Sequence, residues 1–461
     1  MTNLQHLIRK YLMAIGLIAA ATVSAQTVPL QLVNNSDFDD NDIYVAIIGM
    51  QNGQWIYYDL TANTSLDAAI KPLNTSVNTL HRQPNDWGYA NIFTTLDHVK
   101  EQTIHIAHTN ACRLFFGFRS PMYLHAFDAG YAGADFQNPT DPNHGLRWEL
   151  VEFTYDQYDV MFINTTRVDA FQYPMGVELY GTAQSNNDYM KRGELLSYND
   201  IISRWNLQNG NSPFSACYQE SVTTDALGGI IIQPSKVATV KNNGYFDNYI
   251  NQIWSYFATH ELYADMGQRG KWRGTVQGNT FVLTNGGQTA YVNKPSTTDV
   301  IEGAGAFATG SDIDKAVQAQ FCGAMNRGMV DVNTTNGQLQ DWGDRTSFFT
   351  RNTWNPYVAF FHQDDLSHEG YTYAFAYDDT FDQSSTCATK YPDHAVVTIG
   401  GFAPKQSTGI NTHHPSPNTQ HPSPNTQHPS PNTQLYNLAG QRVSNSYHGL
   451  VIQNGKTILK K

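Results

Sequence analysis

Two carboxylic acids in the stretch Trp148–Asp169 have the chemistry for acid–base catalysis. Glu152 lies in the sequence WELVEFTY, and Asp169 ends the sequence FINTTRVD. Alternate side chains of an extended strand share a face, so Glu152 is expected beside the apolar side chains of Trp148 and Leu150. Such surroundings favour the neutral carboxyl that a general acid needs, whereas the polar residues before Asp169 would keep that group ionised. Two carboxyls in contrasting settings are what glycoside hydrolysis requires, although Glu and Asp are also common at strand ends without any chemistry.

The first of these carboxyls lies on a predicted β-hairpin. Residues 147–155 and 160–166 alternate in the manner of strands, and a two-residue turn at 157–158 would join them. In that register Glu152 lies opposite Ile163.

Asp169 can lie close to Glu152 only if the chain turns back between them. On a straight strand Asp169 would lie roughly 20 Å beyond the partner of Glu152, at about 3.4 Å per residue. A pair that cleaves a glycosidic bond with inversion stands about 6.5–9.5 Å apart, which leaves room for a water molecule. We therefore predict a turn or bulge between Asn164 and Asp169, where Asn and Thr side chains compete for backbone hydrogen bonds.

The composition restricts the class of ligand. The 461 residues include 28 Lys and Arg against 40 Asp and Glu, for a formal net charge of −12. A nucleic-acid partner is not expected, because binding phosphates requires a basic face. Aromatic residues make up 12% of the chain, which favours a folded protein and suits a neutral ligand such as a sugar, bound by stacking and hydrogen bonds.

The first 25 residues are typical of a secretory signal peptide. Arg9 and Lys10 precede the apolar run Tyr11–Val23, and small residues precede a predicted cleavage site after Ala25. The run is too short to span a bilayer, for which about 20 residues are needed. We expect a secreted monomer without a membrane span; an uncleaved N-terminal anchor is the alternative.

No metal site and no cofactor are predicted. The sequence HELYA at 260–264 lacks the second histidine of an HExxH zinc motif. In an oxidising compartment the cysteines allow up to two disulfides, with three possible pairings among which the sequence does not choose. None of the four forms a CxxC pair: Cys112, Cys217, Cys322 and Cys387.

The core, residues 26–404, is predicted to be mainly β. Short alternating or apolar runs separated by Gly, Asn, Pro or Asp recur along it, for example VPLQLV, DIYVAIIGM, RLFFGF and VVTIGGF. Helical periodicity appears within residues 199–209, 248–266 and 312–329.

These signals divide the chain into parts. A β-barrel or sandwich is expected from about 26–180 and 350–404, with a mixed α/β part at about 181–349. Residues 405–434 contain HPSPNTQ three times in tandem, and two prolines in every seven residues predict an extended, solvated linker. The tail, 435–461, has the pattern of short strands and carries four basic and no acidic residues.

Six segments between about Pro29 and Phe402 occur in the order that is typical of a known protein family. They are VNNSDFDDNDIYVAIIG, CRLFFGFRSPM, VEFTYDQYDVMFINTTRVDAF, FDNYINQIW, AYDD and VVTIGGF. Together they resemble glycoside hydrolase family 64, the secreted endo-β-1,3-glucanases related in fold to thaumatin-like proteins.

The resemblance implies roles for individual residues. The family's general acid falls on Glu152 and its general base on Asp169. Its sugar-contacting Thr falls on Thr154, an Asn two positions further is replaced by Asp156, and Phe162 stands where a Trp is expected. Substrate contacts are therefore expected from Trp148, Thr154, Asp156, Phe162 and Asn164.

The resemblance also implies an architecture and an activity. The fold would be a thaumatin-like β-barrel beside a mixed α/β domain, with a wide acidic cleft between them. The activity would be inverting hydrolysis of β-1,3-glucan of the laminarin or curdlan type, with release of short oligosaccharides and without a cofactor. The alternative is a thaumatin-like protein that binds β-glucan without cleaving it; the presence of both carboxyls favours the enzyme.

The tail carries a second resemblance. The sequence LYNLAGQRVSNSYHGLVIQNGKTILKK is similar to C-terminal segments of exported Bacteroidetes proteins, some of which are sorting signals for type IX export. This implies an extracellular or outer-membrane surface location in a Bacteroidetes-like bacterium. A hairpin that merely packs on the core is the alternative.

Truncation after Lys405 is expected to leave hydrolysis of soluble laminarin unchanged. The three repeats alone could reach roughly 65 Å at about 3.1 Å per residue, which separates the tail from the catalytic core. Turnover by the full and truncated chains, with folding checked by circular dichroism, measures this. A large loss of turnover in a folded truncated protein would contradict the assignment.

Overall fold

The computed structural model describes residues 27–61, 70–82, 87–182, 188–220, 222 and 224–404, and the backbone of short strands between 435 and 460. The predicted signal peptide (1–25) and linker (405–434) lie outside the described residues. One compact unit of the chain ends at Lys405, and a second begins at Gln406.

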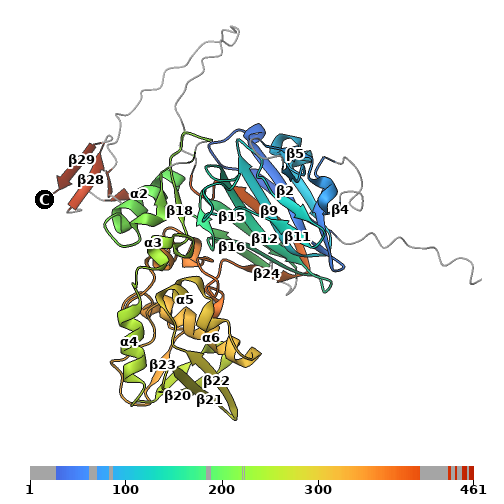
Figure 1. Ribbon diagram of the computed structural model, residues 1–461. Helices are drawn as coiled ribbons and strands as arrows, with labels where there is room; N and C mark the ends of the chain where they lie inside the picture. Colours follow the sequence, from blue (N-terminus) through green and yellow to red (C-terminus); the bar gives the residue numbers. More distant parts are fainter. Residues whose placement is uncertain are drawn as a thin grey trace, which may run out of the picture. The chain divides into compact units, whose positions relative to one another are not determined.

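Two β-sheets that share an apolar core make up the β-rich part of the first unit (Figure 1). The smaller sheet has the order β16 (Asp188–Gly193), β15 (Met175–Gly181), β25 (Pro392–Ile399), β1 (Val28–Asn34) and β8 (Thr103–Ile106). The larger has the order β24 (Cys387–Lys390), β13 (Val160–Thr165), β12 (Arg147–Tyr155), β9 (Thr109–Phe118), β2 (Ile43–Gln51), β3 (Gln54–Tyr58) and β4 (Ile70–Pro72), with β7 (Thr94–Thr95) paired to β2. Apolar side chains of both sheets, among them Leu30, Val151 and Val397, are fully buried in this core, as in a two-layer sandwich.

The first and last strands of this part are neighbours. β1 and β25 pair in parallel, with Leu30 opposite Ala395. β16 pairs with β15 along its whole length, although the sequence analysis placed its residues in the α/β part. The β-rich part therefore extends to Gly193, beyond the predicted boundary at 180.

The α/β part contains a five-stranded sheet with helices against it (Figure 1). Its strand order is β22 (Gln288–Asn293), β21 (Thr280–Asn285), β20 (Lys271–Gln277), β19 (Leu262–Asp265) and β23 (Leu339–Asp341), and its helices are α4 (Asp247–Tyr256), α5 (Thr297–Glu302) and α6 (Asp312–Asn326). The remaining elements include α2 (Tyr198–Asn209), α3 (Ala238–Lys241), α7 (Pro356–Phe361) and a small sheet of β14 (Ala170–Phe171), β18 (Ile230–Ile232) and β17 (Tyr218–Gln219). The predicted fold class, mainly β with a mixed α/β part, is confirmed.

The helix predicted within 248–266 is wrong in its second half. α4 ends at Tyr256, and Leu262–Asp265 forms β19, which pairs with β20 on one side and β23 on the other. β20 follows directly along the chain and β23 lies far from it in sequence, and pairing on both edges stabilises an extended conformation that the local pattern does not reveal.

Helix α6 begins where the sequence predicts it. The Ser311 side chain accepts the N–H of Asp314, and the Asp314 carboxylate accepts the N–H of Ser311, a reciprocal capping box. The same carboxylate accepts the N–H of Tyr291 on β22, so the cap also joins helix to sheet. Val317 and Phe321 on its predicted apolar face are fully buried.

The hairpin of β12 and β13 forms with a register one residue away from the prediction. Glu152 lies opposite Asn164, not Ile163. The connection has three residues, 157–159, and the last of them, Asp159, has a positive φ of 61°. The additional turn residue shifts the pairing by one position, and this register places Asn164 directly beside Glu152.

The predicted break in the backbone after Asn164 is confirmed. β13 ends at Thr165, and the next strand, β14, pairs with β18 in a different sheet. The chain therefore leaves the large sheet after Thr165, four residues before Asp169, and enters the small sheet that contains β18.

A buried arginine holds this break in place. Arg167 forms ion pairs with Glu149 on β12 at 2.8 Å and with Glu194 just after β16 at 2.7 Å, and none of the three side chains is more than 4% exposed. Glu149 also accepts the backbone N–H groups of Gln172 and Tyr173. Burial raises the pKa of Glu149 to about 7, although the positive charge of Arg167 opposes the rise.

The backbone of Arg167 is fixed as well. Its N–H donates to the carbonyl of Tyr373, and its carbonyl accepts the hydroxyl of Tyr357, both at 2.7 Å. Side chain and main chain together anchor the segment that carries Asp169.

None of the helices in the described part of the chain is long and apolar enough to cross a bilayer. In the second unit, four short strands form one sheet in the order β27 (Arg442–Val443), β26 (Leu435–Asn437), β28 (Gly449–Gln453) and β29 (Lys456–Lys460). The strands predicted in the tail are therefore present, and its role in export stays a prediction.

Replacing the buried arginine is expected to destabilise the fold strongly. Arg167→Met keeps much of the side-chain volume but leaves two buried carboxylates without their cation, which costs about 3–5 kcal/mol of unfolding free energy. The exposed pair of Arg273 and Glu261 offers a matched control, and Arg273→Met should cost no more than about 1 kcal/mol. Urea denaturation measures both values. Equal, small losses in the two variants would show that Arg167 does not hold the fold.

Candidate active site

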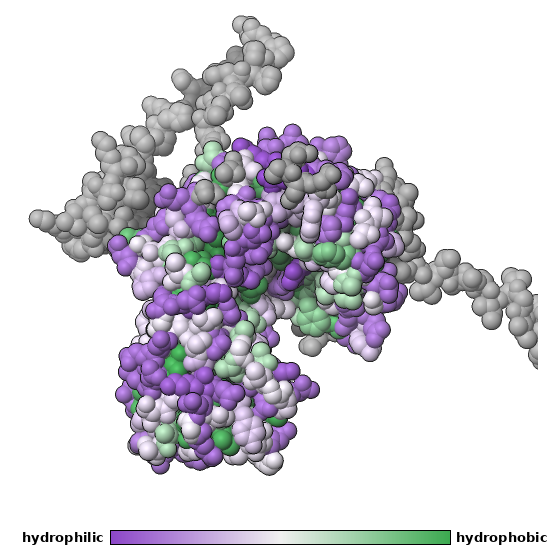
Figure 2. All heavy atoms as spheres, in the orientation of Figure 1, coloured by the Kyte–Doolittle hydropathy of each residue, from purple (hydrophilic) through white to green (hydrophobic). Residues whose placement is uncertain are grey.

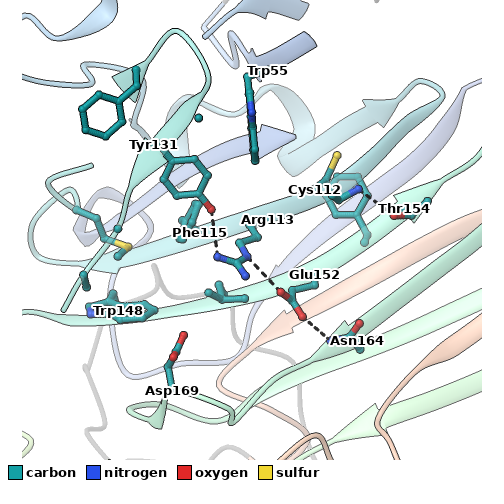
Figure 3. A pocket seen from close by; sticks show the side chains of 18 of the residues that line it. Trp55, Cys112, Arg113, Phe115, Tyr131, Trp148, Glu152, Thr154, Asn164 and Asp169 are labelled. Atoms are coloured by element: carbon teal, nitrogen blue, oxygen red, sulfur yellow. Dashed lines mark hydrogen bonds and ion pairs between the residues drawn. The ribbon is translucent and has the colours of Figure 1, made fainter. Parts of the chain in front are cut away.

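A cavity of about 880 Å³ opens on the outer face of the large sheet (Figure 3). Side chains of β9, β12 and β13 form its floor, and the hairpin of β10 (His125–Phe127) and β11 (Gly130–Ala132) lies at its side. Alternation along β12 decides which side chains face it: Val151 belongs to the core, while Trp148, Leu150 and Glu152 line the cavity.

Six of the seven predicted site residues line this one cavity. They are Trp148, Glu152, Thr154, Phe162, Asn164 and Asp169. Both carboxylates face the cavity, Glu152 from the middle of β12 and Asp169 from the segment after the break (Figure 3). The seventh residue, Asp156, is not among the lining residues; its carboxylate accepts the N–H groups of Tyr158 and Val160 and so stabilises the hairpin turn.

Glu152 has polar partners. Arg113 on β9 donates from Nε to Oε1 at 3.2 Å, and Asn164 on β13 donates from Nδ2 to Oε2 at 3.3 Å. The apolar setting predicted for this carboxyl is therefore wrong, because the strands on both sides of β12 place donors opposite it. Arg113 also donates from Nη1 to the hydroxyl of Tyr131, so one guanidinium joins the carboxyl to the wall of the cavity (Figure 3).

Asp169 has a cationic partner of its own. Lys236 Nζ lies 3.2 Å from Asp169 Oδ1, and both side chains are about one-third exposed. The backbone carbonyl of Asp169 accepts the N–H of Gln233, which ties this residue to the segment after β18. The polar setting predicted for Asp169 is thus observed, but the lysine comes from a distant segment.

Thr154 is fixed by an irregularity in the neighbouring strand. Ala111 on β9 has a positive φ of 50°, and the pairing of β9 with β12 shifts at this point. The N–H of Ala111 donates to Thr154 Oγ1 at 3.0 Å. A β-bulge thus leaves one amide without a ladder partner, and the threonine at the cavity supplies the acceptor.

Aromatic rings surround the carboxyls. Trp148 is nearly buried and stacks on Phe136 with ring centroids 5.6 Å apart. Tyr131 packs edge-on against Trp55 at 5.7 Å, and burial raises the pKa of its hydroxyl. Phe162 is 41% exposed. Such a lining suits a neutral ring with apolar faces and polar edges.

A second cavity, of about 760 Å³, adjoins the first at Phe162. It is lined from the β-rich part by β16 and β24 and from the α/β part by α6 and the segment after β19. Asp379, in the sequence AYDD, lies in it, and burial raises the pKa of this carboxyl, with a further contribution from Asp378. The surface between the two parts is correspondingly hollowed in the space-filling view (Figure 2).

Four further residues, not predicted from the sequence, line the cavity or contact its carboxyls: Trp55, Arg113, Tyr131 and Lys236. Arg113 lies in the segment CRLFFGFRSPM, and its position two residues from Phe115 on an alternating strand was the available signal. No pattern in the sequence indicated Lys236, because only the tertiary fold brings this residue to Asp169.

The cysteines in the described part of the chain are unpaired and buried: Cys112, Cys217, Cys322 and Cys387. Burial raises the pKa of each of these thiols, that of Cys112 to about 12. Among the described residues, no three His, Cys, Asp or Glu side chains converge in a way that could hold a metal ion.

A family model described as β-1,3-glucanase, that of glycoside hydrolase family 64, matches residues 26–399. A crystal structure of a family 64 β-1,3-glucanase domain from Clostridium beijerinckii is 30% identical, with a TM-score of 0.68, covering 81% of this chain and 98% of that one. No curated protein sequence matches.

Two further structures are similar. The laminaripentaose-producing β-1,3-glucanase of family 64 from Paenibacillus barengoltzii is 25% identical, with a TM-score of 0.59, and the match covers 84% of this chain and 78% of that one. A laminaripentaose-producing β-1,3-glucanase in complex with laminaritetraose is 21% identical and shares the fold, with a TM-score of 0.65 and coverage of 82% and 99%. The family model spans nearly the whole described core, including both carboxyls of the cavity, and the chain therefore belongs to glycoside hydrolase family 64, the β-1,3-glucanases.

Proposed function

We propose that this β-1,3-glucanase cleaves internal bonds of the glucan chain with inversion, using Glu152 as general acid and Asp169 as general base. One observation carries the proposal: two carboxyls from different segments of the chain face one cavity, which has an aromatic lining. Inverting hydrolysis needs this arrangement, with an acid on the side of the departing oxygen and a base on the side of the incoming water.

Glu152 is held in place for proton donation. Arg113 and Asn164 each contact one of its oxygens, so the carboxyl has a defined orientation on the floor of the cavity. The guanidinium of Arg113 contacts Oε1 and disfavours a proton there, whereas Oε2 contacts the neutral amide of Asn164, so Oε2 is the oxygen we assign to protonate the glycosidic oxygen. A bound sugar chain excludes water around this group and confines the proton transfer to the substrate.

Asp169 is placed to activate water. Lys236 lies against Oδ1 and orients the carboxylate, which leaves Oδ2 to accept a proton from the attacking water. The backbone break after Thr165 makes this possible, because it turns Asp169 toward the face of β12 that carries Glu152.

The substrate that fits is a β-1,3-glucan of the laminarin or curdlan type. Its neutral rings suit the aromatic lining, and two solved β-1,3-glucanases that share the fold carry laminarihexaose and laminaritetraose. Trp148, Phe162 and Thr154 are the side chains that we assign to sugar contact, whereas Asp156 serves the hairpin turn. No residue of the proposed mechanism calls for a cofactor, and we expect the chain to act as a monomer.

We further propose that the protein acts outside the cytoplasm. The N-terminal 25 residues with the pattern of a signal peptide and the type IX-like tail support this. Immunodetection in fractionated cells tests the location, with the protein expected in the medium or at the outer-membrane surface and not in the cytoplasm.

A non-catalytic glucan-binding protein is the alternative function. Such a protein would use the same cavity and aromatic lining but would not need two carboxyls with separate cationic partners. Turnover by the wild type on laminarin distinguishes the two functions.

Removing either carboxyl is expected to abolish most of the turnover. Glu152→Gln and Asp169→Asn should each lower kcat on laminarin by about 10²–10⁴-fold, because each removes one proton transfer. Matched controls are Glu261→Gln and Asp265→Asn, whose carboxylates form similar ion pairs in the α/β part and should leave kcat unchanged. Reducing-sugar release measures all four. Near-normal kcat in either cavity variant would refute its assigned role.

The stereochemistry of the product provides an independent prediction. Attack by water on the face opposite the departing oxygen converts a β-linkage into an α-anomer. Proton NMR during the first minutes of hydrolysis should therefore show the α-anomer before mutarotation. Early accumulation of the β-anomer would mean a retaining mechanism and would remove the role of Asp169 as base.

A further inference from the structure

Three aromatic side chains form a surface beside the catalytic cavity; we call Trp87, His125 and Phe127 the aromatic rim. The ring centroids of Trp87 and His125 are 5.1 Å apart, and those of His125 and Phe127 are 4.8 Å apart. Trp87 is 61% exposed and Phe127 44% exposed. Large aromatic side chains that stay together in solvent indicate a binding surface, because a folded chain normally covers them.

The aromatic rim is continuous with the cavity. Phe127 lines the cavity and, with His125, lies on the same face of β10. Phe127 pairs with Gly130 on β11, and the Trp55 ring packs against that glycine, 3.7 Å from the position a Cβ would take. Trp55 in turn contacts Tyr131, the hydroxyl partner of Arg113. The hairpin of β10 and β11 thus carries two of the rim residues on one strand and, on the other, the glycine and tyrosine that contact Trp55 at the cavity.

His125 gives the rim a polar group whose ring nitrogens have defined hydrogen-bonding roles. Its Nδ1 lies 2.7 Å from the carbonyl of Gly88, so Nδ1 carries the hydrogen and donates it. In the neutral ring Nε2 is then an acceptor, which suits a hydroxyl donor. The rim combines ring faces for apolar C–H groups with an acceptor for a hydroxyl group, the combination that a sugar requires.

We propose that the aromatic rim binds the part of the glucan chain that extends beyond the cavity, and so extends the substrate-binding site on the side of β10. The inference rests on the proposed function, because the ligand assigned to the rim is the same glucan chain that is proposed to bind in the adjoining cavity. A polymer that passes between Glu152 and Asp169 must leave the cavity at its ends, and the rim is the exposed aromatic surface at the Phe127 end. Such contacts act on substrate and transition state alike, so they change KM rather than kcat.

The test is the variant Trp87→Ala, because Trp87 belongs to the rim and does not line the catalytic cavity, with Tyr291→Ala as the control. Tyr291 is 50% exposed on β22 in the α/β part and lines neither cavity described above. Trp87→Ala should raise KM for laminarin about tenfold with kcat unchanged, since the loss of one aromatic contact with a bound ligand commonly costs that much. On the shortest laminari-oligosaccharide that the wild type cleaves, its KM should equal that of the wild type. The control should behave as wild type on both substrates.

A binding measurement separates this inference from the proposed function. In the Glu152→Gln background, calorimetric titration with laminarin should give a Kd about tenfold higher when Trp87 is also replaced by Ala. An unchanged Kd and an unchanged KM for laminarin would overturn the inference while leaving the catalytic assignment intact. Binding of a protein at the rim, instead of the glucan, would also overturn it. Equal losses on the short and long substrates would also overturn it, because the damage would then lie in the cavity. A wild type that binds laminarin without cleaving it would refute the proposed function, and the change in Kd would still decide the role of the rim.

Discussion

The site depends on one buried guanidinium between two buried carboxylates. Removing charges from water is so unfavourable that they persist inside a protein only with partners, and Arg167 is the partner of both Glu149 and Glu194. These contacts join β12, the end of β16 and the segment after β13 into one rigid junction. Because Asp169 follows two residues later, the junction determines where the second carboxyl lies. The ion pairs therefore serve geometry as much as stability.

The two faces of β12 have different roles: one packs in the core and the other lines the cavity. Glu149 points inward and fixes the junction. Glu152, three residues later on the same strand, points outward into the cavity. Neighbouring strands complete the outward face: β9 supplies Arg113 and β13 supplies Asn164. A single register thus sets the contacts of the proposed acid, and a slip of one residue would turn Asn164 to the opposite face. The separate anchoring of Asp169 by Lys236 allows the two carboxyls to perform different tasks on one substrate.

Much of this architecture was predictable from the sequence, and the errors have physical causes. Period-two alternation identified the strands, the face of Glu152 and, through a distance argument, the break before Asp169. The register was missed by one because the positive φ of Asp159 adds a residue to the turn. The polar setting of Glu152 and the lysine at Asp169 were missed because both depend on strands and loops that meet only in the tertiary structure. The strand at Leu262–Asp265 was taken for helix because its extended conformation depends on pairing at both edges, and one of its partners, β23, is distant in sequence.

The central claim is that Glu152 and Asp169 act on opposite sides of one glycosidic bond. A crystal structure of the Glu152→Gln variant with a bound laminari-oligosaccharide tests it most directly. The account predicts a sugar chain across the cavity, with a glycosidic oxygen within hydrogen-bond distance of the side chain at position 152. It also predicts a water molecule held by Asp169 on the opposite face of the adjoining anomeric carbon. A chain bound elsewhere, or bound with both side chains on the same face of the sugar, would contradict it.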